Sequence, residues 1–347
     1  MNPSSTSVMQ TRQPTEAAPY VDIQNLNVTF TGGPRPVKAV NGVDLRVNRG
    51  EVVALIGESG SGKSVTLRSV LRLHNERRTT ITGRIQVGAQ DALALSSSEL
   101  ADFRGKVTAM IFQEPLLALD PVYSVGAQII ESIRRHEPVS HADARQRALE
   151  LFERVRIPSP ARRLDAYPHE MSGGMRQRAM IALALACRPQ LLLADEPTTA
   201  LDATVQIQVL LLLRELQREF GLSVIFVTHD IGAAVEVADR IAVMYAGRIV
   251  EEGPVATLIR APRHPYTMAL LRSRAHGALA KTGTSGTARP RLDTIAGSPP
   301  DLSVPQSGCS FAPRCRLADD NCRQVQPACV ILPGKHTARC LRLDATA

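Results

Sequence analysis

The sequence predicts an α/β protein with a mostly parallel β-sheet, because three short apolar runs each end in a polar or glycine-rich segment. The runs are VVALI at 52–56, LLLA at 191–194 and LSVIFVT at 222–228. Continuous apolar runs of this length are typical of strands that are buried on both faces of a parallel sheet. Gly57, Asp195 and His229 directly follow these runs, so we expect them to lie together at the carboxyl edge of the sheet.

Composition restricts the class of protein. The chain has 347 residues, enough for about two domains, and 44% of them are hydrophobic. Its longest apolar runs are much shorter than the roughly 18 residues of a membrane span. Residues 1–18 are polar and lack the apolar core of a signal peptide, so we expect a disordered tail and a cytosolic chain with reduced cysteines. The net charge of +8 fits a solvated basic surface, a nucleic acid partner or an anionic membrane.

The first apolar run leads into GESGSGKS, which fits the pattern G-x-x-x-x-G-K-[ST] from Gly57 to Ser64. A helical pattern follows, so the strand, loop and helix context of a phosphate-binding loop is complete. Glycines allow the backbone N–H groups to surround an anion, and the helix N-terminus adds partial positive charge. Lys63 is expected to reach the β- and γ-phosphates, and the Ser64 hydroxyl is expected to bind Mg²⁺.

The second and third runs supply acidic and basic groups. Asp195 is expected to hold the magnesium directly or through water, and Glu196 is placed to polarise the attacking water as a general base. A histidine at a strand end is more often structural. His229 follows a third core strand at the same sheet edge, which favours a contact with the γ-phosphate.

The segment HEMSGGMRQR at 169–178 precedes a strongly apolar helix. Ser172 is a natural N-cap for this helix, and the two glycines after it leave backbone N–H groups for a second phosphate. One loop already surrounds the terminal phosphate, however. Ser172 is therefore expected to contact a nucleotide that is held by another subunit.

Taken together and in this order, these motifs resemble those of ATP-binding cassette (ABC) ATPases, over about residues 20–272. GESGSGKS resembles the Walker A motif, IFQEP the Q-loop with Gln113, MSGGMRQR the signature motif and LLLADE the Walker B motif. ALD places Asp202 in the D-loop, VTHD makes His229 the switch histidine, and Phe30 aligns with the aromatic residue that stacks on adenine. The resemblance implies a P-loop NTPase fold of the ABC type with an antiparallel β subdomain, a helical subdomain and a small Cys-rich C-terminal extension.

The resemblance also implies a role for each site residue. The ATP-binding residues are Phe30, Gly57, Glu58, Ser59, Gly60, Ser61, Gly62, Lys63, Ser64, Val65, Ser172, Gly173, Gly174 and Asp202. The Mg²⁺ ligands are Ser64, Gln113 and Asp195, and the catalytic residues are Glu196, His229 and Gln113.

The stretch from SGGMRQR to 210 and the segment APRHPYTMALL at 261–271 resemble the D-type ATPase subunit of dipeptide and oligopeptide ABC importers. This implies an ATPase at the cytoplasmic face of the plasma membrane that drives the uptake of di- or oligopeptides. The implied partners are a related F-type ATPase subunit, two integral membrane permease subunits and an extracytoplasmic solute-binding protein. Close relatives import nickel or glutathione, so the cargo stays open. The alternative class is a soluble ABC ATPase that acts on nucleic acid. Such proteins usually have a second cassette or a long coiled-coil insert, and this chain has neither. No nucleic acid partner is therefore expected.

Pattern and composition also predict the organisation of the chain. A disordered tail at 1–18 precedes the ABC nucleotide-binding domain at 19–272, with its helical subdomain at about 113–188. Ala246 and Gly247 are expected to form a hairpin turn. Residues 273–291 are small and polar and predict a linker, and 292–347 form the Cys-rich extension.

Five of the six cysteines lie in this extension, at spacings that fit neither a zinc finger nor a ferredoxin. Spacing alone therefore leaves a metal site and packed free thiols as alternatives. The resemblance implies a [4Fe–4S] cluster on Cys309, Cys315, Cys322 and Cys340, with zinc or no metal as the other possibilities. Cys329 departs from the pattern of the family.

Overall fold

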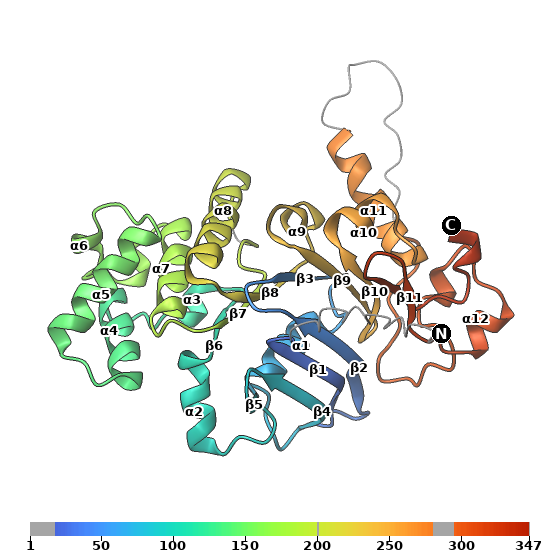
Figure 1. Ribbon diagram of the computed structural model, residues 1–347, viewed down its shortest axis with the longest axis horizontal. Coiled ribbons are helices and arrows are strands. Elements are labelled where there is room, and N and C mark those ends of the chain that lie inside the picture. The colour runs from blue at the N-terminus through green and yellow to red at the C-terminus, as the bar shows by residue number, and fades with distance from the viewer. Residues whose placement is uncertain (1–17, 200, 280–294, 347) are drawn as a thin grey trace, which may run out of the picture.

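Two β-sheets and several layers of helices form the chain in the computed structural model, which describes residues 18–199, 201–279 and 295–346 (Figure 1). The strands are β1 (Val21–Phe30), β2 (Val37–Val47), β3 (Val52–Ile56), β4 (Thr79–Val87), β5 (Gln90–Asp91), β6 (Thr108–Ile111), β7 (Leu191–Asp195), β8 (Ser223–Thr228), β9 (Arg240–Tyr245), β10 (Arg248–Pro254), β11 (Val330–Leu332) and β12 (His336–Ala338). The helices are α1 (Lys63–Val70), α2 (Ser97–Lys106), α3 (Pro115–Ala118), α4 (Val125–His136), α5 (His141–Arg154), α6 (Pro160–Arg163), α7 (Gly173–Leu185), α8 (Ala203–Phe220), α9 (Ile231–Val237), α10 (Val255–Arg260), α11 (Pro265–Leu279) and α12 (Asp320–Gln324), with short 3₁₀ turns η1 (Pro168–Glu170), η2 (Ala312–Arg314) and η3 (Asp344–Thr346).

The larger sheet has the strand order β11-β12-β10-β9-β3-β8-β7-β6. The five consecutive strands from β9 to the edge strand β6 are parallel, which confirms the predicted fold class. Ile56 at the end of β3 pairs with Thr228 of β8, and Asp195 at the end of β7 pairs with Val227. The carboxyl ends of these strands therefore meet at one edge.

The smaller sheet, of order β2-β1-β4-β5, is antiparallel and covers one face of the larger sheet. Alternate residues of β3 show this packing, because successive side chains of a strand point to opposite faces. Val53 and Leu55 join the apolar core beneath the smaller sheet. Ala54 and Ile56 join the core beneath the helices on the other face.

Helices α4 to α7 form a layer at one end of the molecule, beyond β6 (Figure 1). Serine hydroxyls cap three of them: Ser124 begins α4, Ser140 begins α5 and Ser172 begins α7, each accepting a backbone N–H three residues later. Helix α4 packs against α5 and α7 through buried residues that include Ile129 and Ile133. No helix of the described residues is both long and apolar enough to cross a bilayer.

The Cys-rich extension adds two strands to the larger sheet. Strand β12 pairs with β10, where Glu251 lies opposite Ala338, and β11 pairs with β12. The predicted hairpin turn is confirmed, since β9 and β10 are antiparallel and Ala246 has a φ of +48°. Residues 273–279 of the predicted linker belong to α11, in keeping with the alanine and leucine there, and 280–291 lie outside the described residues. Of the predicted tail, residues 1–17 also lie outside them.

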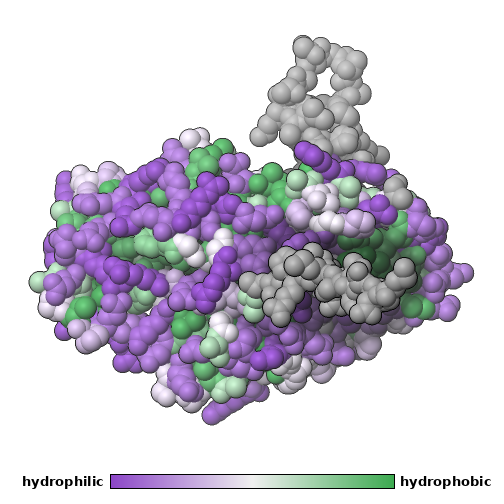
Figure 2. All heavy atoms as spheres, viewed as in Figure 1, coloured by the Kyte–Doolittle hydropathy of each residue, from purple (hydrophilic) through white to green (hydrophobic). Residues whose placement is uncertain are grey.

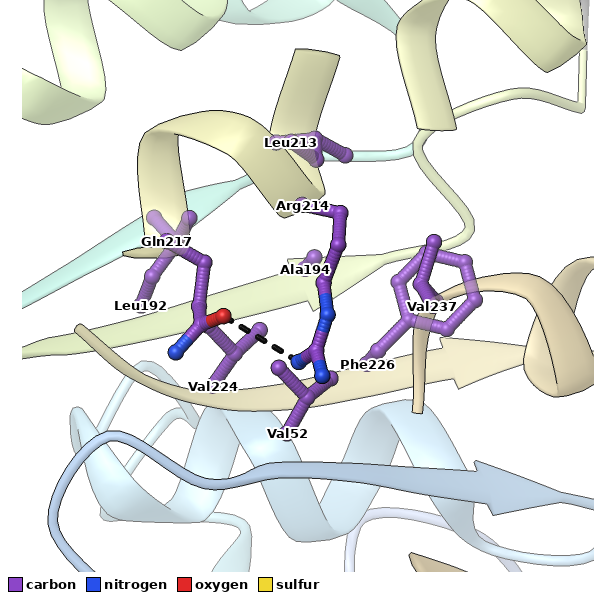
Figure 3. Close-up of a pocket in the computed structure, with 9 residues that line it drawn as sticks. All are labelled: Val52, Leu192, Ala194, Leu213, Arg214, Gln217, Val224, Phe226 and Val237. Carbon is purple, nitrogen blue, oxygen red and sulfur yellow. Dashed lines mark hydrogen bonds between the residues drawn. The ribbon is translucent and has the colours of Figure 1, made fainter. Parts of the chain in front are cut away.

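A small apolar cavity lies between α8, α9 and strands β3, β7 and β8 (Figure 3). Its lining includes Val52, Leu192 and Val224, which stand near the amino ends of their strands. Arg214 of α8 points into it and donates hydrogen bonds to Gln217 (3.1 Å) and to Asp239 (2.5 Å). The cavity also reaches Ala194, directly before Asp195, and lies under α8 between apolar side chains of the sheet. On the surface, hydrophilic residues cover most of the face shown in Figure 2, with small apolar patches between them.

Candidate functional site

The predicted phosphate-binding loop joins β3 to α1 at the carboxyl edge of the parallel strands. Ser59, Gly60 and Ser61 lie within this loop, and Val65 lies in the first turn of α1. Neighbouring backbone carbonyl groups lie so close to both ends of the loop that only glycine fits there. A Cβ on Gly57 would lie 2.2 Å from the carbonyl oxygen of Met244. Gly62 has a φ of +104°, and a Cβ on it would lie 2.5 Å from the carbonyl oxygen of Ala39.

Lys63 lies across this loop and is almost fully buried, with 5% of its surface exposed. Its Nζ donates hydrogen bonds to the carbonyl oxygens of Gly57 (2.8 Å) and Glu58 (2.9 Å). Burial lowers the pKa of the Lys63 ammonium, and the carboxylates of Glu196 and Asp195 oppose this shift. A loop-bound ammonium of this kind can exchange the carbonyl oxygens for phosphate oxygens.

Ser64 and Asp195, two of the three predicted magnesium ligands, meet directly. The Ser64 hydroxyl donates to Oδ1 of Asp195 at 2.6 Å, and Arg68 approaches Oδ2 at 3.5 Å. The Asp195 side chain is fully buried, which raises its carboxyl pKa, whereas the Ser64 hydrogen bond and the Arg68 charge lower it. A hydroxyl and a buried carboxylate in contact beside the phosphate loop form an oxygen donor set that suits Mg²⁺.

Glu196 and His229, the predicted general base and switch histidine, also lie together. Oε2 of Glu196 is 3.0 Å from Nδ1 of His229 and accepts a hydrogen bond from the Thr199 hydroxyl at 2.8 Å. Glu196 has a φ of +45°, the left-handed conformation, directly after the end of β7. Asp195 and Glu196 are thus consecutive residues with different partners. Asp195 contacts Ser64 on α1, and Glu196 contacts His229 after β8.

Gln113 and Phe30 lie at the ends of two further strands. Gln113 follows β6, and β6 pairs with β7 so that Ile111 lies opposite Ala194, one residue before Asp195. Phe30 ends β1, and its ring meets the ring of His74 edge to face, with 5.4 Å between centroids.

The signature segment does not join the site of its own chain. Ser172 is exposed at the start of α7, and its hydroxyl accepts a hydrogen bond from the Met175 N–H at 3.3 Å. Helix α7 is well separated from α1, which carries Lys63, in Figure 1. A Cβ on Gly174 would lie only 2.8 Å from a methyl carbon of Val205 in α8. Asp202 is the N-cap of α8. The structure therefore places Ser172, Gly173 and Gly174 beside the Asp202 segment instead.

Four site contacts were not predicted from the sequence. Arg68 lies one helical turn after Ser64, and Thr199 lies three residues after Glu196, so spacing could have revealed both. Tyr266 accepts a hydrogen bond from the Glu58 N–H at 2.9 Å, and Arg314 forms an ion pair with the Glu58 carboxylate. Neither of these distant residues carries a local signal.

Four cysteines of the extension line one cavity. These are Cys309, Cys315, Cys322 and Cys340. Burial raises the pKa of each of these thiols, to about 11 for Cys340. Cys329 is exposed and does not line this cavity, and all six cysteines are free thiols. Within the described part of the chain, no group of three or more His, Cys, Asp or Glu side chains is arranged to hold a metal ion as it stands.

A buried carboxylate fixes the extension to the domain. Glu251 of β10 is 1% exposed and accepts hydrogen bonds from the backbone N–H groups of Arg263 (2.6 Å) and His264 (2.9 Å). Nε2 of His336 in β12 lies 2.7 Å from the same carboxylate. Burial lowers the pKa of His264 to about 3, so this ring is neutral, and its Nδ1 accepts the Tyr266 N–H.

Comparison with known proteins identifies the class to which this site belongs. The ABC transporter family profile matches residues 40–199. A dimeric ATP-binding cassette in a post-hydrolysis state with bound ADP and Pi is similar in structure, with a TM-score of 0.61 and 30% identity over 68% of this chain and 98% of that one. A component of an ABC transporter complex of Clostridium perfringens has a TM-score of 0.61 and 26% identity over 76% of this chain and 100% of that one. The chain belongs to the ABC transporter ATPases.

The comparisons also place the chain within this class. The family profile for the C-terminal region of oligopeptide/dipeptide transporters matches residues 250–322. A peptide import ATP-binding protein of Brucella melitensis is 47% identical over 342 residues, which cover 95% of this chain and 98% of that protein. A peptide ABC transporter ATP-binding protein of Sinorhizobium fredii is 46% identical over 326 residues, covering 93% and 94%. The chain is thus a member of the oligopeptide/dipeptide branch of the family.

Proposed function

We propose that this chain is the ATP-hydrolysing subunit of an ABC importer and couples ATP binding and hydrolysis to the uptake of di- or oligopeptides. The observation that carries the proposal is the convergence of Lys63, the Ser64–Asp195 contact and the Glu196–His229 contact at one sheet edge. The names of the similar Brucella and Sinorhizobium proteins support peptide as the cargo.

Each group has a distinct part in the ATPase reaction. Magnesium, held by Ser64, Asp195 and Gln113, would neutralise charge on the β- and γ-phosphates. Lys63 binds the same phosphates. Glu196 takes the proton of the attacking water while the Thr199 hydroxyl and His229 orient its carboxylate.

A second cassette completes the site in this proposal. Because Ser172 caps an exposed helix start away from its own phosphate loop, it is free to meet a nucleotide on a facing subunit. ATP then binds the closed pair of cassettes better than the open pair, and hydrolysis removes that preference. We infer that the facing subunit is a related F-type ATPase, which gives a heterodimer.

The segment after Gln113, residues 114–129, is proposed to contact a helix of the permease. Val122 and Tyr123 in this segment are adjacent and are 69% and 58% exposed, so together they offer an apolar surface that suits contact with a permease helix. Two permease subunits and an extracytoplasmic solute-binding protein would complete the importer. The chain would then lie peripherally at the cytoplasmic face of the plasma membrane.

Transport measurements test this function. Proteoliposomes with the chain, its partner cassette and both permeases should take up labelled di- or oligopeptides only when ATP is on the cytoplasmic side. Lys63→Ala should reduce uptake to background, whereas Lys106→Ala, an exposed lysine paired with Asp102 on α2, should not. Uptake of nickel or glutathione but not of peptide would show that the importer carries one of these solutes instead. Salt-sensitive binding to RNA or DNA without permease association would refute the importer function.

We also propose a [4Fe–4S] cluster on Cys309, Cys315, Cys322 and Cys340. The shared cavity supports this ligand set, as does the backbone N–H of Arg342, which donates to Sγ of Cys340 at 3.3 Å. Thiolate ligation would overcome the raised thiol pKa values, because a coordinating thiol is deprotonated by its metal. A bound cluster would act as a structural staple for a small extension with little core of its own.

Anaerobically purified protein should therefore contain iron and acid-labile sulfide at about four atoms of each per chain. Cys315→Ser should lower both contents strongly. The matched variant Cys329→Ser should leave both unchanged, since Cys329 is exposed outside the cavity. A folded extension without either element would exclude the cluster, and zinc in their place would indicate a zinc site.

A further inference from the structure

Glu58, the second residue of the phosphate-binding loop, is held at all of its polar groups. Its N–H donates to the Tyr266 hydroxyl at 2.9 Å, and its carbonyl oxygen accepts from Nζ of Lys63 at 2.9 Å. Its carboxylate accepts two hydrogen bonds from Arg314, from Nη1 to Oε2 at 2.7 Å and from Nη2 to Oε1 at 3.0 Å. This is the bidentate geometry in which a guanidinium binds a carboxylate most strongly.

Arg314 is itself fixed in a buried setting, with 4% of its side chain exposed. Its Nε donates to the Ala296 carbonyl oxygen at 2.9 Å, and Nη1 donates to the Tyr245 hydroxyl at 3.2 Å. The guanidinium carbon lies 5.8 Å from the centre of the Tyr245 ring and 6.0 Å from that of Phe311. The hydrogen bond to Glu58 is the largest contribution to a raised pKa of Arg314, so the guanidinium stays charged.

The residue comes from the middle of the Cys-rich extension. Arg314 ends the turn η2, which starts where the Ala312 N–H donates to the Cys309 carbonyl oxygen at 2.9 Å. Cys315 follows directly, and its N–H returns to the carbonyl oxygen of Ala312 at 3.2 Å. The cysteine-lined part of the extension therefore sets the position of the guanidinium at the phosphate loop.

The charge of Glu58 explains why this contact matters. A carboxylate in a loop that binds the phosphates of ATP repels them unless a cation neutralises it. The Arg314 side chain is buried and the Glu58 side chain is partly buried, so solvent screens their attraction less than it would at the surface. The loop also has glycines that permit several backbone conformations, and the contact with Arg314 holds one of them.

We propose that Arg314 is a positioning residue for the ATPase reaction, which neutralises Glu58 and holds the phosphate-binding loop from the C-terminal extension. The proposal rests on the assignment of residues 57–64 as that loop. It makes the extension part of the nucleotide site of this chain. Whatever binds the four cysteines is then linked to ATP affinity through Arg314.

Equilibrium binding of a fluorescent ATP analogue to the full chain, with KM and kcat for ATP in the assembled importer, tests this role. Arg314→Ala should weaken ATP binding about tenfold, which corresponds to about 1.4 kcal/mol, and should raise KM more than it lowers kcat. Adding Glu58→Gln to Arg314→Ala should restore most of the affinity, because the unpaired carboxylate is then removed. Arg316→Ala, an exposed arginine two residues away, should bind ATP like the wild type.

Three outcomes would overturn the proposal. These are unchanged ATP affinity in Arg314→Ala, no recovery in the double variant, or an equal loss in Arg316→Ala. Should Arg314→Ala fail to fold, Arg314→Lys serves in its place. Lysine keeps the positive charge but cannot form the bidentate pair of hydrogen bonds with the Glu58 carboxylate. It should bind ATP several-fold more weakly than the wild type, and unchanged affinity would refute the role. Lys63→Ala should lose ATP binding in every case, and normal binding there would refute the loop assignment itself.

Discussion

Replacement of Glu196 by Gln should leave ATP binding intact and lower the rate of ATP hydrolysis by about 10²–10⁴-fold, the usual contribution of a general base. Glutamine keeps the shape of the side chain and can still accept the hydrogen bond from Thr199. Its amide cannot take a proton from water at neutral pH, so only the chemical step is affected. The variant complex should therefore accumulate with bound ATP in its closed state.

Steady-state ATPase rates of the assembled importer and equilibrium binding of ATP would measure the two effects separately. Glu236→Gln is the matched control, since it makes the same chemical change at an exposed carboxylate on α9. Its turnover should equal that of the wild type. Unchanged hydrolysis in Glu196→Gln would remove Glu196 from its role, and loss of ATP binding would show that its charge acts on the ground state instead.

The sequence was sufficient to predict the parts of the site that single strands carry. Asp195 and His229 directly follow apolar runs, with Glu196 next after Asp195, and parallel pairing brings strand ends to one edge whatever the rest of the chain does. The glycine pattern likewise determines the loop geometry locally, because Gly57 and Gly62 have no room for a Cβ. These predictions needed only local patterns.

Contacts between distant segments could not be predicted in this way. Arg314 is 256 residues from Glu58, and nothing in the spacing of either residue indicates the other. Strands β11 and β12 have three residues each, too few for a period of two to be visible, so their addition to the main sheet was not expected. No sequence pattern indicates that Glu251 is buried, yet its carboxylate lies in the core with the backbone N–H of Arg263 and the ring of His336 at hydrogen-bond distance.

The two-subunit arrangement is tested by Ser172→Arg. This variant should bind ATP at its own phosphate loop as well as the wild type does, because α7 lies apart from α1 (Figure 1). Hydrolysis at the facing site should fall by about 10²-fold, the scale of losing a donor that stabilises transition-state charge. An arginine at the start of α7 removes the cap and places a long side chain where the two cassettes would meet.

Cap loss alone must be separated from this effect. Ser140→Arg is the matched control, because Ser140 is also an exposed N-cap, whose hydroxyl accepts from the Asp143 N–H at 3.1 Å on α5. Both variants should lose about 1 kcal/mol of stability from the missing cap, measured by denaturant unfolding. Only Ser172→Arg should also lose hydrolysis at the partner site, because in the proposed pair only its helix start would face the nucleotide of the other cassette. Equal turnover in the two variants, or full-rate hydrolysis by the chain as a monomer, would mean that one cassette carries a complete site and that the pairing has another cause.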